Sequence, residues 1–396
     1  MLSKNSILDH TVTTFVTSKE GKQLSTRRVL FHVADRTRHY NTASSQIIQE
    51  QLSPVSVALC PTPRCVRECT FCSNTQRNKK NREINAEYSE NVFSQIIDDL
   101  NNLKVMGVSI AGGGEPLAYD KGIFYDFLAQ ESPPYKIGIH TNGVLLMKIL
   151  TERVVNAGNI KYINVSVVAH TPTLYQKVAR RGSSQFFAIE CNLKKAITLS
   201  RQNGSFPTLG VKVLLNRDNF RYVSEIKGYF ESLGIENVLL RCVSNFEPNQ
   251  DVELSPAENK ELSDILSTNL NLPDEQVRAI VGNKTAQEIP LPSRCWIMAL
   301  QYTAGIDPDG ETYLCSPWSR KEYSIGNIND KRFRELWGSD QHHKVAEALN
   351  NNLRNNLCNP LSCRHYYSNL AIDAFVDGLI GDLPKNQIEE MYGYFI

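Results

Sequence analysis

Ten cysteines in an otherwise ordinary sequence are the residues best suited to chemistry, and seven of them fall into two groups. The first group is Cys65, Cys69 and Cys72, whose spacings of three and two residues let one loop turn three thiolates toward one point. Thiolates suit iron–sulfur clusters and zinc alike. Three ligands on a four-iron cube would leave one iron open to a non-protein ligand. A zinc site is the alternative, although no nearby fourth ligand completes it.

The second group lies in the last quarter of the chain and comprises Cys295, Cys315, Cys358 and Cys363. Four cysteines divided between a predicted hairpin and a later loop can close around one cluster, with a four-cysteine zinc site as the alternative. Cys191 and Cys242 fall on a predicted helix and strand, so we expect core thiols there.

The elements that must position the first group alternate between strand and helix from residue 54 onward. Strands are predicted at 55–59, 108–111, 136–140, 162–168, 209–215 and 237–243, and helices at 87–106, 120–130, 145–157, 185–202 and 220–233. Strict alternation implies parallel strands with right-handed crossovers. A site then lies beyond the carboxyl ends of the strands, where the cysteines, Gly112-Gly113-Gly114 and Thr141-Asn142-Gly143 all fall.

The alternation stops after residue 245, which indicates a change of architecture. Residues 255–282 and 330–348 are predicted to be helical, and His342 and His343 are expected on a solvated helix face. Strands are predicted at 296–304 and 311–315, because an Asp-Gly pair between apolar runs is a hairpin signal. We therefore divide the chain into an N-terminal extension (1–54), a core (55–245), a helical linker (246–290), a small cluster-bearing domain (291–370) and a tail (371–396).

The cysteine loop resembles the signature of the radical SAM superfamily, including the aromatic Phe71 before the last cysteine. Gly113, Gly114 and Glu115, followed by Pro116, resemble the Gly-Gly-Glu-Pro motif of that family. The resemblance covers roughly residues 54–245 and implies a partial (β/α)6 barrel, a 4Fe–4S cluster on Cys65, Cys69 and Cys72, and S-adenosylmethionine (SAM). SAM would chelate the open iron, and its reductive cleavage would yield a 5′-deoxyadenosyl radical.

Further cofactor contacts follow from the same resemblance. Phe71, Gly113, Gly114 and Glu115 are expected at the SAM site, where a β-carbon on either glycine would obstruct the methionyl end while the barrel still folds. Ser166 and Arg181 resemble positions that contact the ribose and the methionyl carboxylate, with Arg180 as the alternative to Arg181. Val167-Val168-Ala169-His170 departs from the family's usual continuation after that serine.

The second cysteine group resembles the auxiliary-cluster twitch module, the reduced form of the SPASM domain. Ile306-Asp307-Pro308-Asp309-Gly310-Glu311 before Cys315 and Glu335-Leu336-Trp337 further on carry this resemblance. It implies an α/β fold overall, with the barrel followed by a small α+β domain holding a second, fully ligated 4Fe–4S cluster. Such a cluster favours net oxidation of the substrate.

The expected function is therefore radical SAM oxidation of a small sugar-like or aminocyclitol-like molecule in natural-product biosynthesis. Modification of a ribosomally made peptide and a non-catalytic iron–sulfur or zinc protein are the alternatives. No residue is assigned as a catalytic acid or base. An external one-electron donor such as flavodoxin or ferredoxin is expected.

Composition narrows the class of protein further. Hydrophobic residues make up 41% of the 396 residues, which excludes wholesale disorder. Lys plus Arg number 43 against 42 for Asp plus Glu, and a chain with this balance is not built around a broad phosphate-binding face for nucleic acid, with a local basic patch as the open alternative. No apolar run approaches the length of a membrane span, and the start lacks the apolar segment of a signal peptide. A cytoplasmic location is the expectation.

Overall fold

The computed structural model describes residues 30–33, 36, 52–72, 83, 86–204, 206–243, 253–281, 291–358, 363 and 365–379. Its central feature is one nine-stranded sheet with the strand order β6-β5-β4-β3-β2-β1-β7-β8-β9. The first six strands are parallel to one another, and each pairs with its neighbour in sequence. They are β1 (Ser56–Leu59), β2 (Gly107–Ile110), β3 (Lys136–Thr141), β4 (Ile160–Val167), β5 (Thr208–Leu215) and β6 (Asn237–Cys242).

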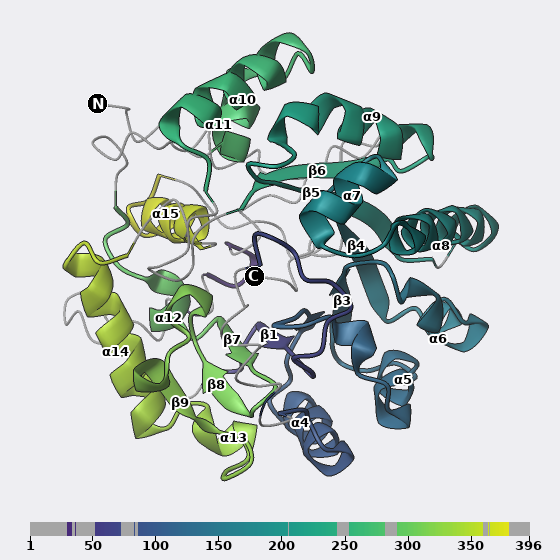
Figure 1. Cartoon of the computed structure of the whole chain (residues 1–396). Helices are drawn as coiled ribbons and strands as arrows, with labels where there is room; N and C mark the ends of the chain where they lie inside the picture. Colours follow the sequence, from purple (N-terminus) through teal and green to yellow (C-terminus); the bar gives the residue numbers. More distant parts are fainter. Residues whose placement is uncertain are drawn as a thin grey trace.

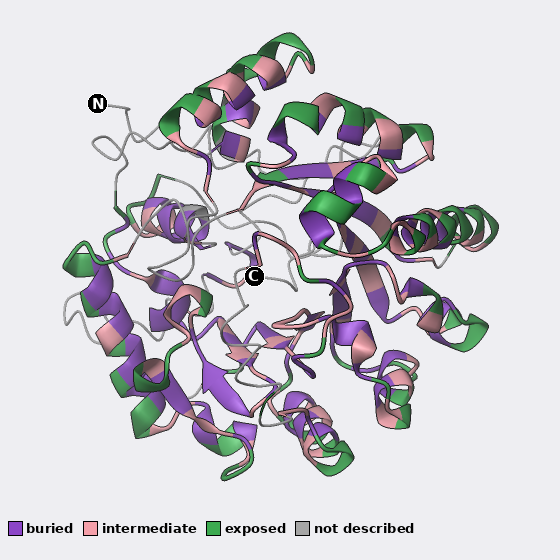
Figure 2. Cartoon of the chain, in the orientation of Figure 1, coloured by how far each residue is buried: buried purple, intermediate pink, exposed green. Residues whose placement is uncertain are grey.

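Helices connect these strands and lie on the outside of the curved sheet (Figure 1). They are α4 (Glu90–Asn102), α5 (Gly122–Leu128), α6 (Glu152–Asn156), α7 (Pro172–Ala179), α8 (Ser183–Gln202) and α9 (Val223–Ser232). Alternate strand residues such as Ile137, Ile139, Ile163 and Val165 are buried against this helical layer. Figure 2 shows the same division, with buried residues on the strands and on the inward sides of the helices. The predicted partial α/β barrel is confirmed.

The C-terminal part extends the same sheet. β7 (Thr303–Ile306) pairs in parallel with β1, so that Ser56 lies opposite Thr303. β8 (Glu311–Tyr313) and β9 (Ser324–Asn327) follow as antiparallel strands. The predicted Asp-Gly hairpin is present, because Gly310 donates its N–H to the Asp307 carbonyl and adopts a φ of +87°. β1 is therefore an interior strand, hydrogen-bonded to β2 on one side and to β7 on the other.

Several predicted elements differ from the observed ones. The segment predicted as a strand at 296–304 begins as α12 (Trp296–Ala299). The helix predicted at 330–348 is two helices, α13 (Phe333–Leu336) and α14 (Asp340–Arg354), separated at Gly338, whose φ is +76°. The helix predicted at 255–282 is likewise divided into α10 (Pro256–Thr268) and α11 (Asp274–Val281).

α15 (Tyr366–Val376) runs across residue 370, so the boundary predicted there falls inside a helix. The prediction for His342 and His343 is wrong, since both side chains are buried. Cys191 is exposed, so the prediction of a core thiol is wrong for that residue. Most of the N-terminal extension lies outside the described residues.

Candidate functional site

The first cysteine group lies on the loop that leaves the carboxyl end of β1. Backbone hydrogen bonds fasten this loop to the C-terminal turn of α7, because the Glu68 N–H donates to the Ala179 carbonyl and the Thr70 N–H donates to the Val178 carbonyl. The Cys72 N–H donates to the Cys69 carbonyl at 3.2 Å, which makes a tight turn. All three cysteines are partly exposed and are not in disulfides.

Arg67, between Cys65 and Cys69, makes side-chain hydrogen bonds that hold this loop against the rest of the barrel. Its side chain is 5% exposed. The guanidinium donates to the carbonyl oxygens of Asn142 at 2.5 Å and Ser166 at 3.0 Å, beyond β3 and within β4. Its Nε donates to the Tyr175 hydroxyl at 3.1 Å. The loop is thereby joined to the ends of two further strands and to α7.

Glu115 connects the end of β2 to the end of β3. Its buried carboxylate accepts hydrogen bonds from the Thr141 hydroxyl at 2.5 Å, the Asn142 N–H at 2.7 Å and the Leu117 N–H at 3.2 Å. Burial raises the pKa of this carboxyl, and these donors oppose the rise. Both carboxylate oxygens are therefore occupied by the protein, so the side chain acts as a brace within the predicted SAM motif.

Gly114 of that motif is required by the close approach of the protein's own backbone. A β-carbon on Gly114 would lie 2.3 Å from the Arg64 carbonyl oxygen and 2.5 Å from the Pro63 carbonyl carbon. The Glu115 N–H also donates to the Arg64 carbonyl at 2.7 Å. A side chain at Gly114 would therefore displace the start of the cysteine loop, which differs from the expectation that it would obstruct SAM alone.

Asn142 is a site residue that the sequence signalled only weakly, through an Asn-Gly pair after the third strand. Its Nδ2 lies 3.8 Å from the Cys65 Sγ, within hydrogen-bond distance of a sulfur acceptor. Hydrogen bonds to cysteine sulfur tune an iron–sulfur cluster. The structure thus brings together the ends of β1, β2 and β3 around Cys65.

The other residues predicted to contact SAM make the following contacts within the protein. Ser166 lies on β4, and its carbonyl oxygen is held by Arg67. Arg181 donates to the Val66 carbonyl at 2.9 Å and forms an ion pair with Glu68, so it braces the outside of the cysteine loop. Phe71 is buried in the core. Arg180 caps α7 in the left-handed conformation, with a φ of +52°.

Burial dominates the electrostatics of the first thiol group. It raises the pKa of Cys69 to about 11 and also raises the pKa of Cys65. The nearby Arg67 charge lowers both pKa values, whereas Cys72 raises both, so the three thiols interact with one another. Ligation by iron would release the thiol protons, because the thiolate is the ligand. This donor set fits a four-iron cluster chemically.

The second group is assembled around the hairpin. Burial raises the pKa of Cys295 to about 12, and interactions with Cys363 and Cys358 add to the rise. Burial also raises the pKa of Cys315, and interactions with Cys295 and Cys363 raise it further. The thiols of this group therefore lie within electrostatic reach of one another, and four cysteine thiolates are a donor set that suits a fully ligated cluster.

Two buried asparagines that sequence reasoning missed support this group. The Cys295 N–H donates to Asn350 Oδ1 on α14 at 3.1 Å. Asn369 on α15 places its Nδ2 3.8 Å from the Cys295 Sγ and accepts the Ile297 N–H at 3.0 Å. Asparagine amides inside apolar helix faces become recognisable as functional only once the helices are packed.

The two groups lie at opposite ends of neighbouring strands. The first follows the carboxyl end of β1, whereas Cys315 follows β8, which runs antiparallel to β7 and returns toward the start of β1. β1 and β7 pair over four residues, and four residues of strand span about 13 Å. The sheet itself therefore sets the spacing between the two thiol groups.

Polar side chains line the inner face of the sheet, opposite the helices. His140 on β3 and Tyr162 on β4 are partly exposed, and the His140 Nε2 and Tyr162 hydroxyl lie 3.1 Å apart. Tyr162 lies over Gly138, where a β-carbon would meet its ring at 2.2 Å. Asn164 lies opposite His140 in the register of β3 and β4. His140 is two residues before Asn142, whose side chain contacts the Cys65 sulfur. This face presents hydrogen-bonding groups near the first thiol group.

Within the described ranges, no group of three His, Cys, Asp or Glu side chains is arranged to hold a single metal ion. None of the helices in the described part is both long and apolar enough to cross a membrane.

Comparison with known protein families gives two matches. Residues 59–226 match the radical SAM superfamily, and residues 295–364 match SPASM, an iron–sulfur cluster-binding domain. A cofactor-modifying protein for tungsten-containing aldehyde ferredoxin oxidoreductase from Pyrococcus furiosus is 24% identical over 71% of this chain and 80% of its own length. The mycofactocin maturase MftC of Mycolicibacterium smegmatis is 22% identical over 86% of this chain and 84% of its own length.

Solved structures share the fold. Native anSMEcpe with bound AdoMet and a Kp18Cys peptide superposes with a TM-score of 0.51 at 14% identity, over 79% of this chain and 87% of that one. SuiB of Streptococcus suis bound to the precursor peptide SuiA gives a TM-score of 0.52 at 14% identity, over 79% of this chain and 69% of that one.

Proposed function

Because the chain belongs to the radical SAM superfamily and carries a C-terminal SPASM domain, we propose that Cys65, Cys69 and Cys72 hold the 4Fe–4S cluster to which SAM binds. We further propose that Cys295, Cys315, Cys358 and Cys363 hold one auxiliary cluster. The observation that carries the proposal is the placement of two thiol groups on one sheet, the first beyond the carboxyl end of β1 and the second near the start of β7. The cofactors supply a 5′-deoxyadenosyl radical and a one-electron acceptor.

The chain's own residues hold the cysteine loop in place. Arg67 joins the loop to the end of β3 and to β4, and the Glu115 N–H donates to the Arg64 carbonyl at the start of the loop, so a cluster on these thiolates would be held at the strand ends. Gly114 permits the loop to approach the end of β2. Substrate would bind on the inner face of the sheet and present one C–H for abstraction, and a net two-electron oxidation would follow.

The leading substrate class is a small polar molecule that carries a secondary alcohol or amine, such as a sugar or an aminocyclitol. The inner face supports this class, because His140, Tyr162 and Asn164 offer hydrogen-bond donors and acceptors one layer from the first thiol group. Such groups orient hydroxyl- and amine-bearing ligands.

A peptide substrate is the second candidate. It is favoured by the names of two similar proteins, a mycofactocin maturase and SuiB solved with its precursor peptide. An external one-electron donor of the flavodoxin or ferredoxin type would reduce the first cluster in either case.

The test begins with anaerobic reconstitution of the whole chain. Replacing Cys65, Cys69 and Cys72 with Ala is expected to remove roughly half of the iron and all reductive cleavage of SAM. Cys191→Ala is the matched control, since this exposed thiol belongs to neither group, and it should retain full iron and cleavage. Unchanged iron in the triple variant, or zinc in place of iron, would contradict the assignment.

The substrate class is tested by hydrogen transfer. Deuterated aminocyclitols and deuterated peptides are incubated separately with the reconstituted protein, SAM and dithionite. Deuterium should appear in 5′-deoxyadenosine with the first set, as measured by mass spectrometry. Transfer from peptides alone would replace the small-molecule assignment with the peptide one.

A further inference from the structure

Arg67 is a buried cation inside the cysteine loop, between two of the proposed cluster ligands. The acceptors of its guanidinium are two backbone carbonyls and the Tyr175 hydroxyl, all of them uncharged, whereas its backbone N–H donates to the Cys65 Sγ at 3.5 Å. Its guanidinium also lies 5.3 Å from the centre of the Tyr175 ring. A buried charge whose hydrogen-bond partners are all neutral is costly unless another charge compensates it.

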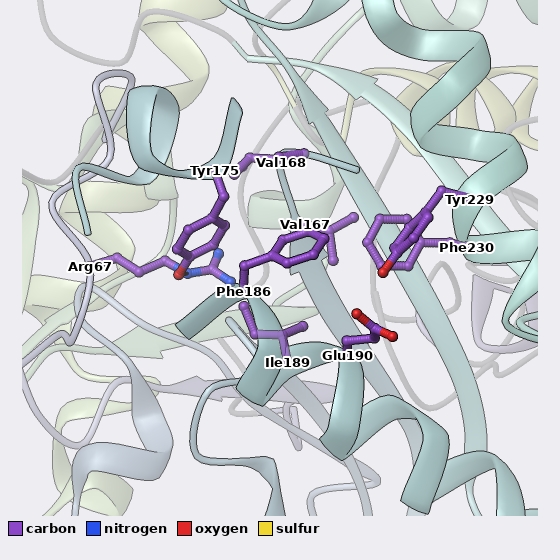
Figure 3. A pocket seen from close by; sticks show the side chains of 10 residues that line it. Arg67, Val167, Val168, Tyr175, Phe186, Ile189, Glu190, Tyr229 and Phe230 are labelled. Carbon is purple, nitrogen blue, oxygen red and sulfur yellow. Dashed lines mark hydrogen bonds between the residues drawn. The ribbon is translucent and has the colours of Figure 1, made fainter. Parts of the chain in front are cut away.

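The surroundings of Arg67 offer little dielectric screening. Figure 3 shows the guanidinium beside Tyr175, at the edge of a pocket lined by apolar side chains that include Val167, Phe186 and Ile189. An electrostatic interaction is stronger in such a setting than in water. The guanidinium donates to the Asn142 carbonyl, and the Asn142 Nδ2 lies 3.8 Å from the Cys65 Sγ, so a charge on the Cys65 sulfur lies near this cation.

Two acidic residues near Arg67 are already engaged elsewhere. Glu115 interacts electrostatically with Arg67, but its carboxylate oxygens accept hydrogen bonds from Thr141, Asn142 and Leu117. Glu190, at the far end of the same pocket, forms an ion pair with Lys194. The groups closest in sequence that would carry negative charge are the thiolates of Cys65 and Cys69, and the Cys65 Sγ already accepts the Arg67 backbone N–H at 3.5 Å.

We propose that Arg67 is a positioning residue of the cluster-binding loop and that its fixed positive charge raises the reduction potential of the cluster held by Cys65, Cys69 and Cys72. The inference rests on the proposed ligand assignment. A cluster on three thiolates carries net negative charge, and one-electron reduction makes that charge more negative without moving a proton. A fixed cation nearby therefore stabilises the reduced state more than the oxidised state.

The experiment compares Arg67→Gln, Arg67→Lys and the control Lys177→Gln in the reconstituted full-length protein. Lys177 is suitable because it also lies near the loop, but it is 64% exposed and is paired with Asp218. Iron is quantified, and each protein is titrated with dithionite while the reduced cluster is followed by electron paramagnetic resonance. The signal that changes when SAM is added identifies the relevant cluster.

Arg67→Gln should shift the midpoint potential to a more negative value while iron is retained. Arg67→Lys, which keeps the charge, should shift it less, and Lys177→Gln should leave it unchanged. An unchanged potential in Arg67→Gln with full iron would overturn the inference. Equal shifts in the two Arg67 variants, or iron loss in both, would mean that the guanidinium only fastens the loop.

Failure of the underlying assignment would look different. In that case Cys65→Ala would retain both its iron and the SAM-responsive signal, whatever the Arg67 variants do.

Discussion

Replacing Asp99 with Asn should weaken the attachment of the C-terminal part to the barrel. Asp99 lies on α4 and is 1% exposed, and it accepts hydrogen bonds from Arg332 next to α13 at 2.6 and 3.0 Å. The same guanidinium donates to Asp98 at 2.7 Å and to the Gln95 carbonyl at 3.1 Å. One arginine therefore joins two elements that are more than 200 residues apart in sequence.

The magnitude follows from the exposure of each partner. Removing one member of a fully buried ion pair costs about 3–5 kcal/mol, because the remaining charge loses its partner. Arg332 is 25% exposed and keeps Asp98, so we expect a loss of about 2–3 kcal/mol for Asp99→Asn. Asp98 is 56% exposed, so water screens its ion pair, and the matched control Asp98→Asn should cost clearly less stability than Asp99→Asn.

The assay is equilibrium urea unfolding of the anaerobic protein, followed by far-ultraviolet circular dichroism. Equal slopes against urea concentration are required, so that the midpoints report free energies of unfolding. If the free energies of unfolding of the two variants differ by less than about 1 kcal/mol, the reasoning is refuted. Burial of the carboxylate would then not decide how much each ion pair with Arg332 contributes to stability.

Two further variants test local geometry and acid sensitivity. Gly114→Ala should displace the cysteine loop and lower iron loading of the first cluster, whereas Gly122→Ala, which meets nothing within 4 Å, should load normally; equal loading would contradict the close approach. His342 is buried with a pKa lowered to about 3 by burial, below its unfolded value of about 6.5, so the unfolded state binds more protons between these values. Stability should therefore fall by about 2 kcal/mol from pH 7 to pH 5, and His342→Gln should abolish most of that slope in urea unfolding; an unaltered slope would exclude His342 as its source.

The six parallel strands were predictable because each is a short apolar run bounded by turn residues. Their observed limits agree with the prediction within two residues at each end. α7 was missed, although Thr171 caps it and Pro172 occupies its first turn. Thr-Pro is a recognisable helix start, but eight residues carry too little periodicity to reveal a helix without it.

The pairing of β7 with β1 could not be predicted, because strand partners far apart in sequence leave no local trace. The prediction that His342 and His343 lie on a solvated face of α14 was wrong for a related reason. The His342 ring packs at a 60° tilt against Trp337 with ring centres 4.4 Å apart, and its Nδ1 accepts the Gly338 N–H at 2.8 Å. Packing partners from outside the helix decide which of its faces is buried.

The candidate cysteines could be identified from the sequence by residue type and spacing. The residues that orient them could be identified only from the folded structure. Arg67 reads as one of many basic residues until its guanidinium is seen to join β3, β4 and α7. Arg181 was selected by its sequence position as a contact to the cofactor carboxylate, which stays a prediction, and only the fold shows that it also pairs with Glu68 and donates to the Val66 carbonyl. Sequence spacing thus identifies the cysteines that could ligate a cluster. The hydrogen bonds of the folded protein determine how the loop that carries them is oriented.

The continuity of the sheet has a mechanical consequence for the two proposed clusters. β1 carries the first cysteine loop at its carboxyl end and is hydrogen-bonded along its length to both β2 and β7. Moving the hairpin relative to the loop would break a parallel ladder inside the sheet, where unpaired backbone groups are costly. The spacing between the thiol groups is therefore fixed by the β1–β7 ladder and by the Arg332–Asp99 ion pair, and not by the chain that connects β6 to α12. Under the proposed function, transfer of an electron from the substrate radical to the auxiliary cluster would depend on such a fixed separation, so the ladder would serve the chemistry together with the cysteines.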